Sequence, residues 1–197
     1  MDMSGNYKGL VTELLPNAAI TIDRFHVMKL VNQELDVARR NTKKAAESLS
    51  NVTEKARLKA TLHQTKYVLL KSEEDLTQEQ QLKLESLRKV SPLLARMHSL
   101  KEEFREIFET AQNWTDGTLR LLDWLASAKA DFQKSVGTIT RWFGEIVGYF
   151  DQGTTNGVVE GINNKLKLIK RSGYGFRNFE NFQLRCFICW YLNDALA

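Results

Sequence analysis

The sequence predicts a mostly α-helical protein, and two observations carry this prediction. Between about residue 24 and residue 150, apolar side chains recur three and four positions apart, which places them on one face of successive α-helices. Helix-start patterns lie in the same region. The T-Q-E-Q run at 77–80 fits a capping box, and S-P at 91–92 joins an N-cap residue to a proline at the first helical position.

The elements that precede this region are short. A helix through Leu10 and Leu14 is expected to end near Pro16, and residues 18–22 have the composition of a short strand. Asp23 is a suitable N-cap for the helix that follows it. We expect that helix to continue through the polar residues 39–59, which would project into solvent.

Three further helices are expected after residue 91, each with its own apolar stripe. The first repeats at alternating spacings of four and three, as an interhelical seam requires. Thr115 is expected to cap the second, and the third is expected to run from about residue 136 to residue 150. The three stripes are Leu93, Met97, Leu100, Phe104 and Ile107, then Leu119, Leu122, Leu125 and Phe132, then Ile139, Phe143, Ile146 and Phe150.

The functional interpretation centres on an amphipathic helix over residues 156–171. Its apolar stripe is Val159, Ile162, Leu166 and Ile169, and its polar face is Glu160, Asn163, Asn164, Lys167, Lys170 and Arg171. A carboxylate followed by amides and cations can hold a metal ion and a phosphate together. The same pattern also fits a surface helix whose charges match its dipole, with Thr155 or Asn156 as N-cap.

A glycine turn at 172–177 and a last helix from Phe179 to about residue 192 end the chain. This helix is expected to bury Phe182, Cys186, and Cys189 or Trp190. Its two cysteines form a single C-x-x-C pair, which is at most half of a zinc site. Buried thiols are therefore the expected state.

Composition and charge narrow the class of protein. The 197 residues are 43% apolar and 26% charged, with neither a bilayer-length apolar run nor a secretory signal pattern. We therefore expect a cytoplasmic protein with no membrane partner.

The positive charge is unevenly distributed along the chain. The net charge is +4. Residues 160–185 hold six basic and two acidic residues, whereas residues 1–159 carry a net charge of only +1. This excess predicts phosphate binding near Glu160, although similar patches occur on proteins that bind no nucleic acid.

The run N-G-V-V-E-G-I-N-N-K-L-K-L-I-K-R-S-G-Y-G-F-R-N-F-E-N-F-Q-L-R at 156–185 resembles the C-terminal catalytic signature of bacterial DDE transposases of the ISL-three insertion-sequence group. The resemblance extends to M-D-M-S-G-N-Y at 1–7 and D-R-F-H-V at 23–27. It implies a C-terminal remnant of a ribonuclease-H-like α/β core, interrupted by a large all-helical insertion. Residues 1–34 would be partial core, 35–150 the insertion, and 151–197 the C-terminal catalytic helices.

The resemblance also implies the chemistry. Such enzymes use three carboxylates to hold two Mg²⁺ ions about 4 Å apart for attack on a phosphodiester. Glu160 matches the third carboxylate and Asp2 the second, so both are expected metal ligands and catalytic residues. Asp23 and His26 match a supporting D-x-x-H element. Asp23 is also the alternative second ligand, and a purely local capping role for Asp23 and His26 competes with both.

Cations and turn residues after Glu160 are expected to contact DNA. Lys167 would meet a phosphate, and its neighbours would extend the contact along the backbone. The aromatic candidate for base stacking is Trp142, although tryptophans at helical spacing are more often core residues, and the turn residues could equally anchor the turn. The expected DNA contacts are Lys165, Lys167, Lys170, Arg171, Tyr174, Arg177 and Trp142.

The family's first acidic residue has no counterpart in this sequence, so we expect a truncated or split transposase that is inactive alone. Mg²⁺ is expected only in the complete catalytic domain. Expected partners are transposon ends, target DNA, and a second copy or a full-length transposase at the bacterial nucleoid. Two alternatives stay open: a noncatalytic DNA-binding or dimerisation fragment that modulates an intact transposase, and a helical interaction protein whose resemblance is vestigial.

Overall fold

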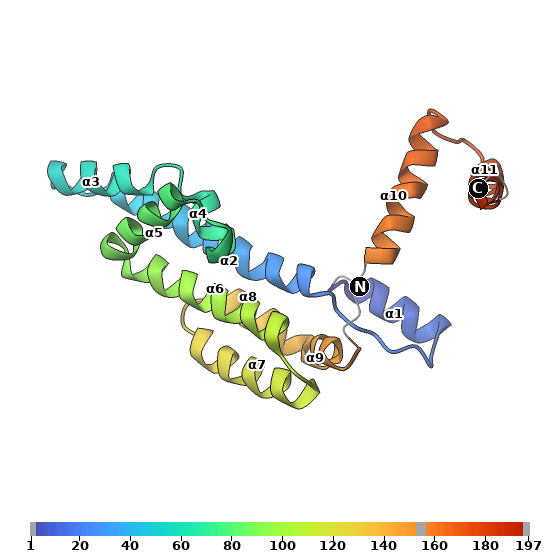
Figure 1. Ribbon diagram of the computed structural model, residues 1–197, viewed down its shortest axis with the longest axis horizontal. Coiled ribbons are helices and arrows are strands. Elements are labelled where there is room, and N and C mark those ends of the chain that lie inside the picture. The colour runs from blue at the N-terminus through green and yellow to red at the C-terminus, as the bar shows by residue number, and fades with distance from the viewer. Residues whose placement is uncertain (1–2, 153–156, 195–197) are drawn as a thin grey trace. The chain divides into compact units, whose positions relative to one another are not determined.

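The computed structural model describes residues 3–152 and 157–194, which are mostly helical as predicted (Figure 1). The chain divides into two compact units, Met1–Thr154 and Thr155–Ala197. The elements are α1 (Gly5–Leu14), α2 (Arg24–Glu47), α3 (Val52–Leu62), α4 (Lys66–Leu70), the 3-10 turn η1 (Glu73–Asp75), α5 (Gln78–Val90), α6 (Pro92–Thr110), α7 (Trp114–Ala128), α8 (Gln133–Arg141), α9 (Phe143–Gln152), α10 (Gly157–Ser172) and α11 (Phe179–Asp194). None of the described helices combines the length and the apolarity that crossing a bilayer requires.

The strand expected at residues 18–22 is wrong, because these residues adopt no regular secondary structure. A strand is stabilised by the backbone hydrogen bonds of a neighbouring strand, and the described ranges contain none. Instead the Ile22 amide donates to the carbonyl oxygen of Glu145 in α9 at 3.0 Å, and the Ile22 side chain is completely buried. Ile22 therefore packs against a helix, while Ala18 and Ala19 stay exposed.

The polar residues 39–59 form two helices, so the single projecting helix expected there is also wrong. Helix α2 ends at Glu47, and Asn51 caps α3 by accepting hydrogen bonds from the amides of Thr53 and Glu54. Serine and asparagine side chains compete for backbone groups and favour such a break. Helix α3 then packs against α2 and α5.

Helix α6 forms the centre of the first unit and packs against α2, α5 and α7. The N-cap of Ser91 and the capping box at 77–80 are confirmed. The expected seam is confirmed at its last four positions but wrong at Leu93, which is 48% exposed, while Leu94 is completely buried. Trp124 of α7 closes the contact, since its indole N–H donates to the Leu100 carbonyl oxygen at 2.7 Å and its ring lies 4.4 Å from that of Phe104.

The register of α7 and the extent of the following helix differ from expectation. Asn113, not Thr115, is the N-cap of α7, and Leu119 and Leu122 are exposed. The buried face of α7 is Leu121, Trp124, Leu125 and Ala128. The helix expected over residues 136–150 is two helices, α8 and α9, that meet at Trp142.

The N-terminus of α8 is capped by a residue from α2. The Glu34 carboxylate accepts hydrogen bonds from the amides of Lys134 and Ser135 at 3.1 and 2.7 Å, and from the Ser135 hydroxyl at 2.7 Å. A carboxylate at this position satisfies free amides and suits the positive end of the helix dipole. This contact fixes α8 to α2 across a hundred residues of sequence.

The second unit contains α10 and α11, joined by the expected glycine turn. Tyr174 and Gly175 have positive φ values of 52° and 92°, and the Gly175 amide bonds back to the carbonyl oxygen of Lys170. Ile169 is buried. Half-buried positions in this unit include Leu166, Phe182, Cys186 and Cys189. The side chains of Val159, Ile162 and Trp190, and the cap candidates Thr155 and Asn156, lie outside the described part.

We predict that Leu94→Ala lowers the free energy of unfolding by about 2–5 kcal/mol, because it leaves a cavity in a fully packed site. The neighbouring Leu93→Ala is the matched control, and its effect should stay within about 0.5 kcal/mol because that side chain is largely in solvent. Urea denaturation followed by circular dichroism measures both values. Equal losses for the two variants would contradict the assigned register of α6.

Candidate functional site

The two carboxylates expected to bind metal are only partly covered by the structure. Asp2 lies outside the described residues, and Glu160 lies within α10 but its side chain is outside the described part. Among the side chains that the structure describes, which exclude that of Glu160, no three from histidine, cysteine, aspartate or glutamate converge as a metal ion requires. A Mg²⁺ site that uses Asp2 and Glu160 therefore stays a prediction.

Asp23 and His26 lie together at the start of α2. The Asp23 carboxylate accepts a hydrogen bond from the Phe25 amide at 2.8 Å, which confirms its capping role, and the Asp23 carbonyl oxygen accepts one from the His26 amide at 3.0 Å. Both side chains are half-buried, and the His26 ring meets that of Phe25 edge-on. Their expected role in supporting a catalytic site stays a prediction.

The cations expected to contact DNA are accessible on α10 and the turn after it. Lys167, Lys170 and Arg171 are exposed, Lys165 is half-buried, and Arg177 is exposed beyond the turn. Tyr174 is fully exposed. Tyr174 lies in the turn after α10, with a positive φ of 52°, whereas residues 167, 170 and 171 follow the three-and-four spacing of one face of the helix. This face, which we call the α10 basic face, can therefore meet a phosphate backbone.

Trp142, unlike the other residues expected to contact DNA, is buried. Its ring is only 6% exposed and is covered by the Lys8 ammonium at 5.2 Å from the ring centroid. Trp124 is 3% exposed, whereas Trp114 is 47% exposed. This burial makes both Trp124 and Trp142 core residues, as tryptophans at helical spacing usually are. Base stacking on Trp142 would need its ring to become accessible.

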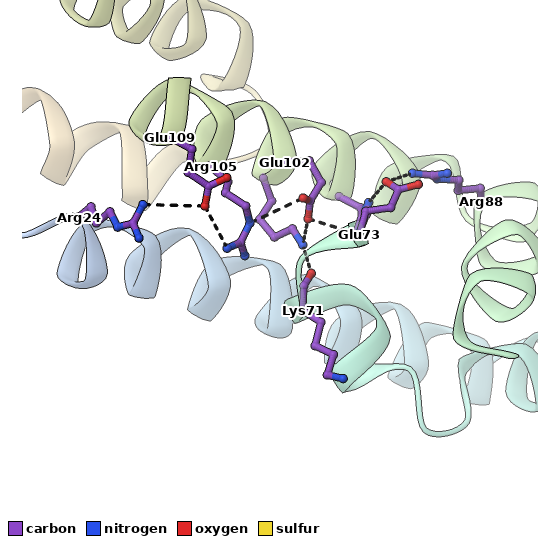
Figure 2. Close-up of polar contacts among 9 residues, drawn as sticks. Arg24, Lys71, Glu73, Arg88, Glu102, Arg105 and Glu109 are labelled. Atoms are coloured by element: carbon purple, nitrogen blue, oxygen red, sulfur yellow. Dashed lines mark hydrogen bonds and ion pairs between the residues drawn. The ribbon is translucent and has the colours of Figure 1, made fainter. Parts of the chain in front are cut away.

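Sequence analysis missed a charged cluster on α6 whose centre, formed by Lys101 and His98, is buried (Figure 2). Lys101 is completely buried, donates to the Lys71 carbonyl oxygen at 2.5 Å and forms an ion pair with Glu102. Further ion pairs extend the cluster on both sides. They are Arg88 with Glu73 at 2.7 Å, Arg105 with Glu102 at 3.7 Å and Glu109 at 4.0 Å, and Arg24 with Glu109 at 3.8 Å.

His98 lies inside this cluster and is completely buried. Its two ring nitrogens are each 3.9 Å from a carboxylate oxygen, of Glu73 on one side and Glu102 on the other. Burial, reinforced by Lys101, Arg88 and Arg105, lowers the pKa of His98 to about 3. Burial also lowers the pKa of Lys101. The hydrogen bond and the negative charge of Glu102 act in the opposite direction and raise it. The one sequence signal for these residues is their position on the inner stripe of α6, between Leu94 and Phe108.

The arrangement is structural, because it joins the segment after α4 to α6. Breaking a buried ion pair is strongly destabilising even where the intact pair adds little net stability. The Lys101 ammonium also donates to the backbone carbonyl oxygen of Lys71, which follows the last residue of α4. The cluster therefore fixes where α4 lies relative to α6.

We predict a pH dependence of stability from His98. Its pKa is lower in the folded chain than the ordinary value of 6.5, so the unfolded chain binds the extra proton, and stability falls as the pH drops from 6.5 toward 3. The slope from this residue reaches at most about 1.4 kcal/mol per pH unit. Urea unfolding across this range should give a shallower slope for His98→Gln and an unchanged slope for the exposed His63→Gln. Identical slopes for wild type and His98→Gln would disprove the assignment.

Comparison with known proteins identifies the family. A family model described as a transposase, of the DDE type and ISL-three group, matches residues 1–186. The chain is 30% identical over 186 aligned residues to a transposase for insertion sequence element IS1557 of Mycobacterium tuberculosis, covering 86% of this chain and 42% of that protein. It is 23% identical over 194 aligned residues to a transposase for insertion sequence element IS1001 of Bordetella parapertussis, covering 94% and 45%.

A shorter stretch of 57 residues is 39% identical to a Lactococcus lactis protein named ATP-dependent protease, covering 29% of this chain and 18% of that one. No solved structure matches the chain significantly. The chain spans less than half the length of the transposases it matches. Because the family match extends over residues 1–186 of 197, the chain belongs to the ISL-three family of DDE transposases.

Proposed function

We propose that this chain supplies the C-terminal part of a transposase catalytic domain that cleaves and joins DNA during movement of an insertion sequence. The observation that carries the proposal is the α10 basic face, which follows Glu160 within the region matched by the family model. Positive side chains that follow an acidic residue on the same helix suit a site where phosphates meet a metal ion. The site of action would be DNA in the bacterial cytoplasm.

Each candidate residue has a distinct role in this proposal. Glu160 supplies the third carboxylate and Asp2 the second, with Asp23 as the alternative second ligand and His26 in support. Carboxylate oxygens are the hard ligands that Mg²⁺ prefers, and a bound pair of ions would stabilise the attacking and leaving oxygens. Lys167 holds the DNA phosphate beside this site.

The finer architecture belongs to the same proposal. Residues 1–34 would complete a ribonuclease-H-like core when joined to the rest of a transposase, residues 35–150 would be its helical insertion, and residues 151–197 would carry the catalytic glutamate. Helix α2 runs without a break through positions 34 and 35, so the insertion would begin inside a continuous helix.

We infer that residues 1–197 alone perform little or no strand transfer, because the family's first carboxylate has no counterpart among them. The partners would be transposon ends, target DNA, and a second copy or a longer transposase that supplies the missing acid. A noncatalytic fragment that modulates an intact transposase is the alternative function.

The α10 basic face makes a direct prediction for DNA binding. Lys167→Ala/Lys170→Ala/Arg171→Ala should weaken binding to duplex DNA of any sequence and lower the slope of log affinity against log salt by about 0.9 for each lost phosphate contact. The matched control, Lys83→Ala/Lys89→Ala/Lys129→Ala, removes three cations from the first unit and should have little effect. Fluorescence anisotropy titrations at several salt concentrations measure both, and equal losses would contradict a specific role for α10.

Complementation tests catalysis separately from binding. We predict that this chain restores strand transfer to a full-length transposase of the same family whose third carboxylate has been replaced, and that Glu160→Gln abolishes the rescue without weakening DNA binding. The assay uses labelled transposon ends with Mg²⁺. Inhibition of an intact transposase by both the wild-type chain and Glu160→Gln, without any rescue, would instead favour the noncatalytic alternative.

A further inference from the structure

The first unit contains a second concentration of positive charge, larger than the one around α10. Residues 24–71 hold eleven lysines and arginines against four aspartates and glutamates, a net charge of +7. The net charge of residues 1–159 is nevertheless only +1, because acidic residues elsewhere in that range offset this excess. The basic excess is therefore not confined to the segment around Glu160, as the totals for residues 1–159 and 160–185 had suggested.

Part of this charge lines a groove between α2 and α4. The groove has a volume of about 720 Å³, and Lys29, Arg40 and Lys66 contribute its cations. Asp36 is the one carboxylate among its lining residues, and it already pairs with Arg39 at 2.8 Å and Arg40 at 3.3 Å. The groove therefore presents an excess of positive charge to a ligand.

The cations continue beyond the groove along the same face of α2. Lys29, Arg40, Lys43 and Lys44 fall within about 60° of a common direction at 100° per residue, and they span about 22 Å of helix. Lys29, Lys43 and Lys44 are exposed. Within the part of the chain that the structure describes, these three lysines form no ion pair. A row of this kind suits a chain of phosphates better than a single anion.

Apolar and aromatic surface accompanies the cations. Met28, Val37 and Leu70 line the groove, and Phe25 at one end is 66% exposed. Tyr67 beside the groove is 69% exposed, with the Lys66 ammonium 5.8 Å from its ring centroid. Exposed aromatic rings beside a track of cations are the features with which proteins hold unpaired bases and their backbone.

We propose that the groove between α2 and α4 binds single-stranded DNA, with phosphates along Lys29, Arg40 and Lys66 and a base stacked on Phe25. The volume is in the range of pockets for one small molecule, which suits a single nucleotide unit of an unpaired strand. The inference extends the proposed transposase function, on which it rests, because it gives the helical region its own contact to an unpaired strand.

Binding of an oligothymidylate of about 20 nucleotides and of a duplex of equal length, each followed by fluorescence anisotropy, tests the proposal. Lys29→Ala/Arg40→Ala/Lys66→Ala should weaken single-strand binding about tenfold or more at low salt and reduce the salt slope by about 2, at roughly 0.7 for each contact. The control Lys83→Ala/Lys89→Ala/Lys129→Ala has the same change in charge outside the groove and should change affinity less than about threefold. Thermal unfolding of both variants confirms that the fold is intact.

Phe25→Leu separates stacking from general charge attraction. It keeps an apolar side chain but removes the aromatic face, so single-strand affinity should fall about fivefold or more while duplex affinity stays constant. Because the side chain is mostly exposed, the variant should fold normally. Unchanged single-strand affinity in Phe25→Leu, or equal losses for the groove variant and its charge control, would overturn the proposal.

The α10 variant in the same titrations distinguishes this proposal from the broader one. Loss of duplex binding on changing α10, together with wild-type single-strand binding by the groove variant, would refute the groove and leave the transposase function standing. Loss of single-strand binding only in the groove variant, with no effect of α10 on duplex binding, would support the groove and count against the proposed role of α10.

Discussion

The burial of Lys101 in helix α6 is the constraint on which the arrangement of the first unit depends. An ammonium group without solvent is stable only when acceptors surround it, and here these are the Lys71 carbonyl oxygen and the Glu102 carboxylate. The first of these contacts fixes the end of α4, since Lys71 directly follows that helix. The position of α4 next to α2 therefore depends on a charge buried in a third helix.

This dependence links packing to the proposed function. The groove exists because α4 lies beside α2, and α2 in turn packs against α6. Its buried side carries Val27, Val31 and Leu35, which are all fully buried. Glu34 on the same helix caps α8. Helix α2 thus has a buried side that organises the core and an exposed side that carries Lys29, Lys43 and Lys44, which form no ion pair with the described residues. A surface built on so constrained a helix can hold a DNA strand in a fixed position.

The two basic surfaces belong to different units and suit different roles. The α10 basic face follows Glu160, the residue proposed as the third carboxylate, and is built on one helix that ends in a glycine turn. The groove lies in the helical region, where exposed aromatic rings accompany the cations. In a transposase, these surfaces would allow one chain to contact a duplex near the site of chemistry and an unpaired strand elsewhere.

Signals confined to a few neighbouring residues determined much of this protein from sequence alone. The helical class, the caps at Asp23, Thr77 and Ser91 and the glycine turn at Gly175 could all be read from such patterns. The family was read from a longer run, at 156–185, together with the segments 1–7 and 23–27. Local propensity and capping act within three or four residues, so they remain visible without a structure.

Contacts between distant segments were decided only by tertiary structure. They buried Leu94 in place of Leu93, placed Lys101 and His98 in the interior and supplied Glu34 as the cap of α8. They also brought Lys66 of α4 beside Lys29 and Arg40 of α2. These outcomes depend on which helix faces pack together, and the helices concerned can lie a hundred residues apart in the sequence. The periodicity of one helix shows which face is apolar but not which helix will cover it.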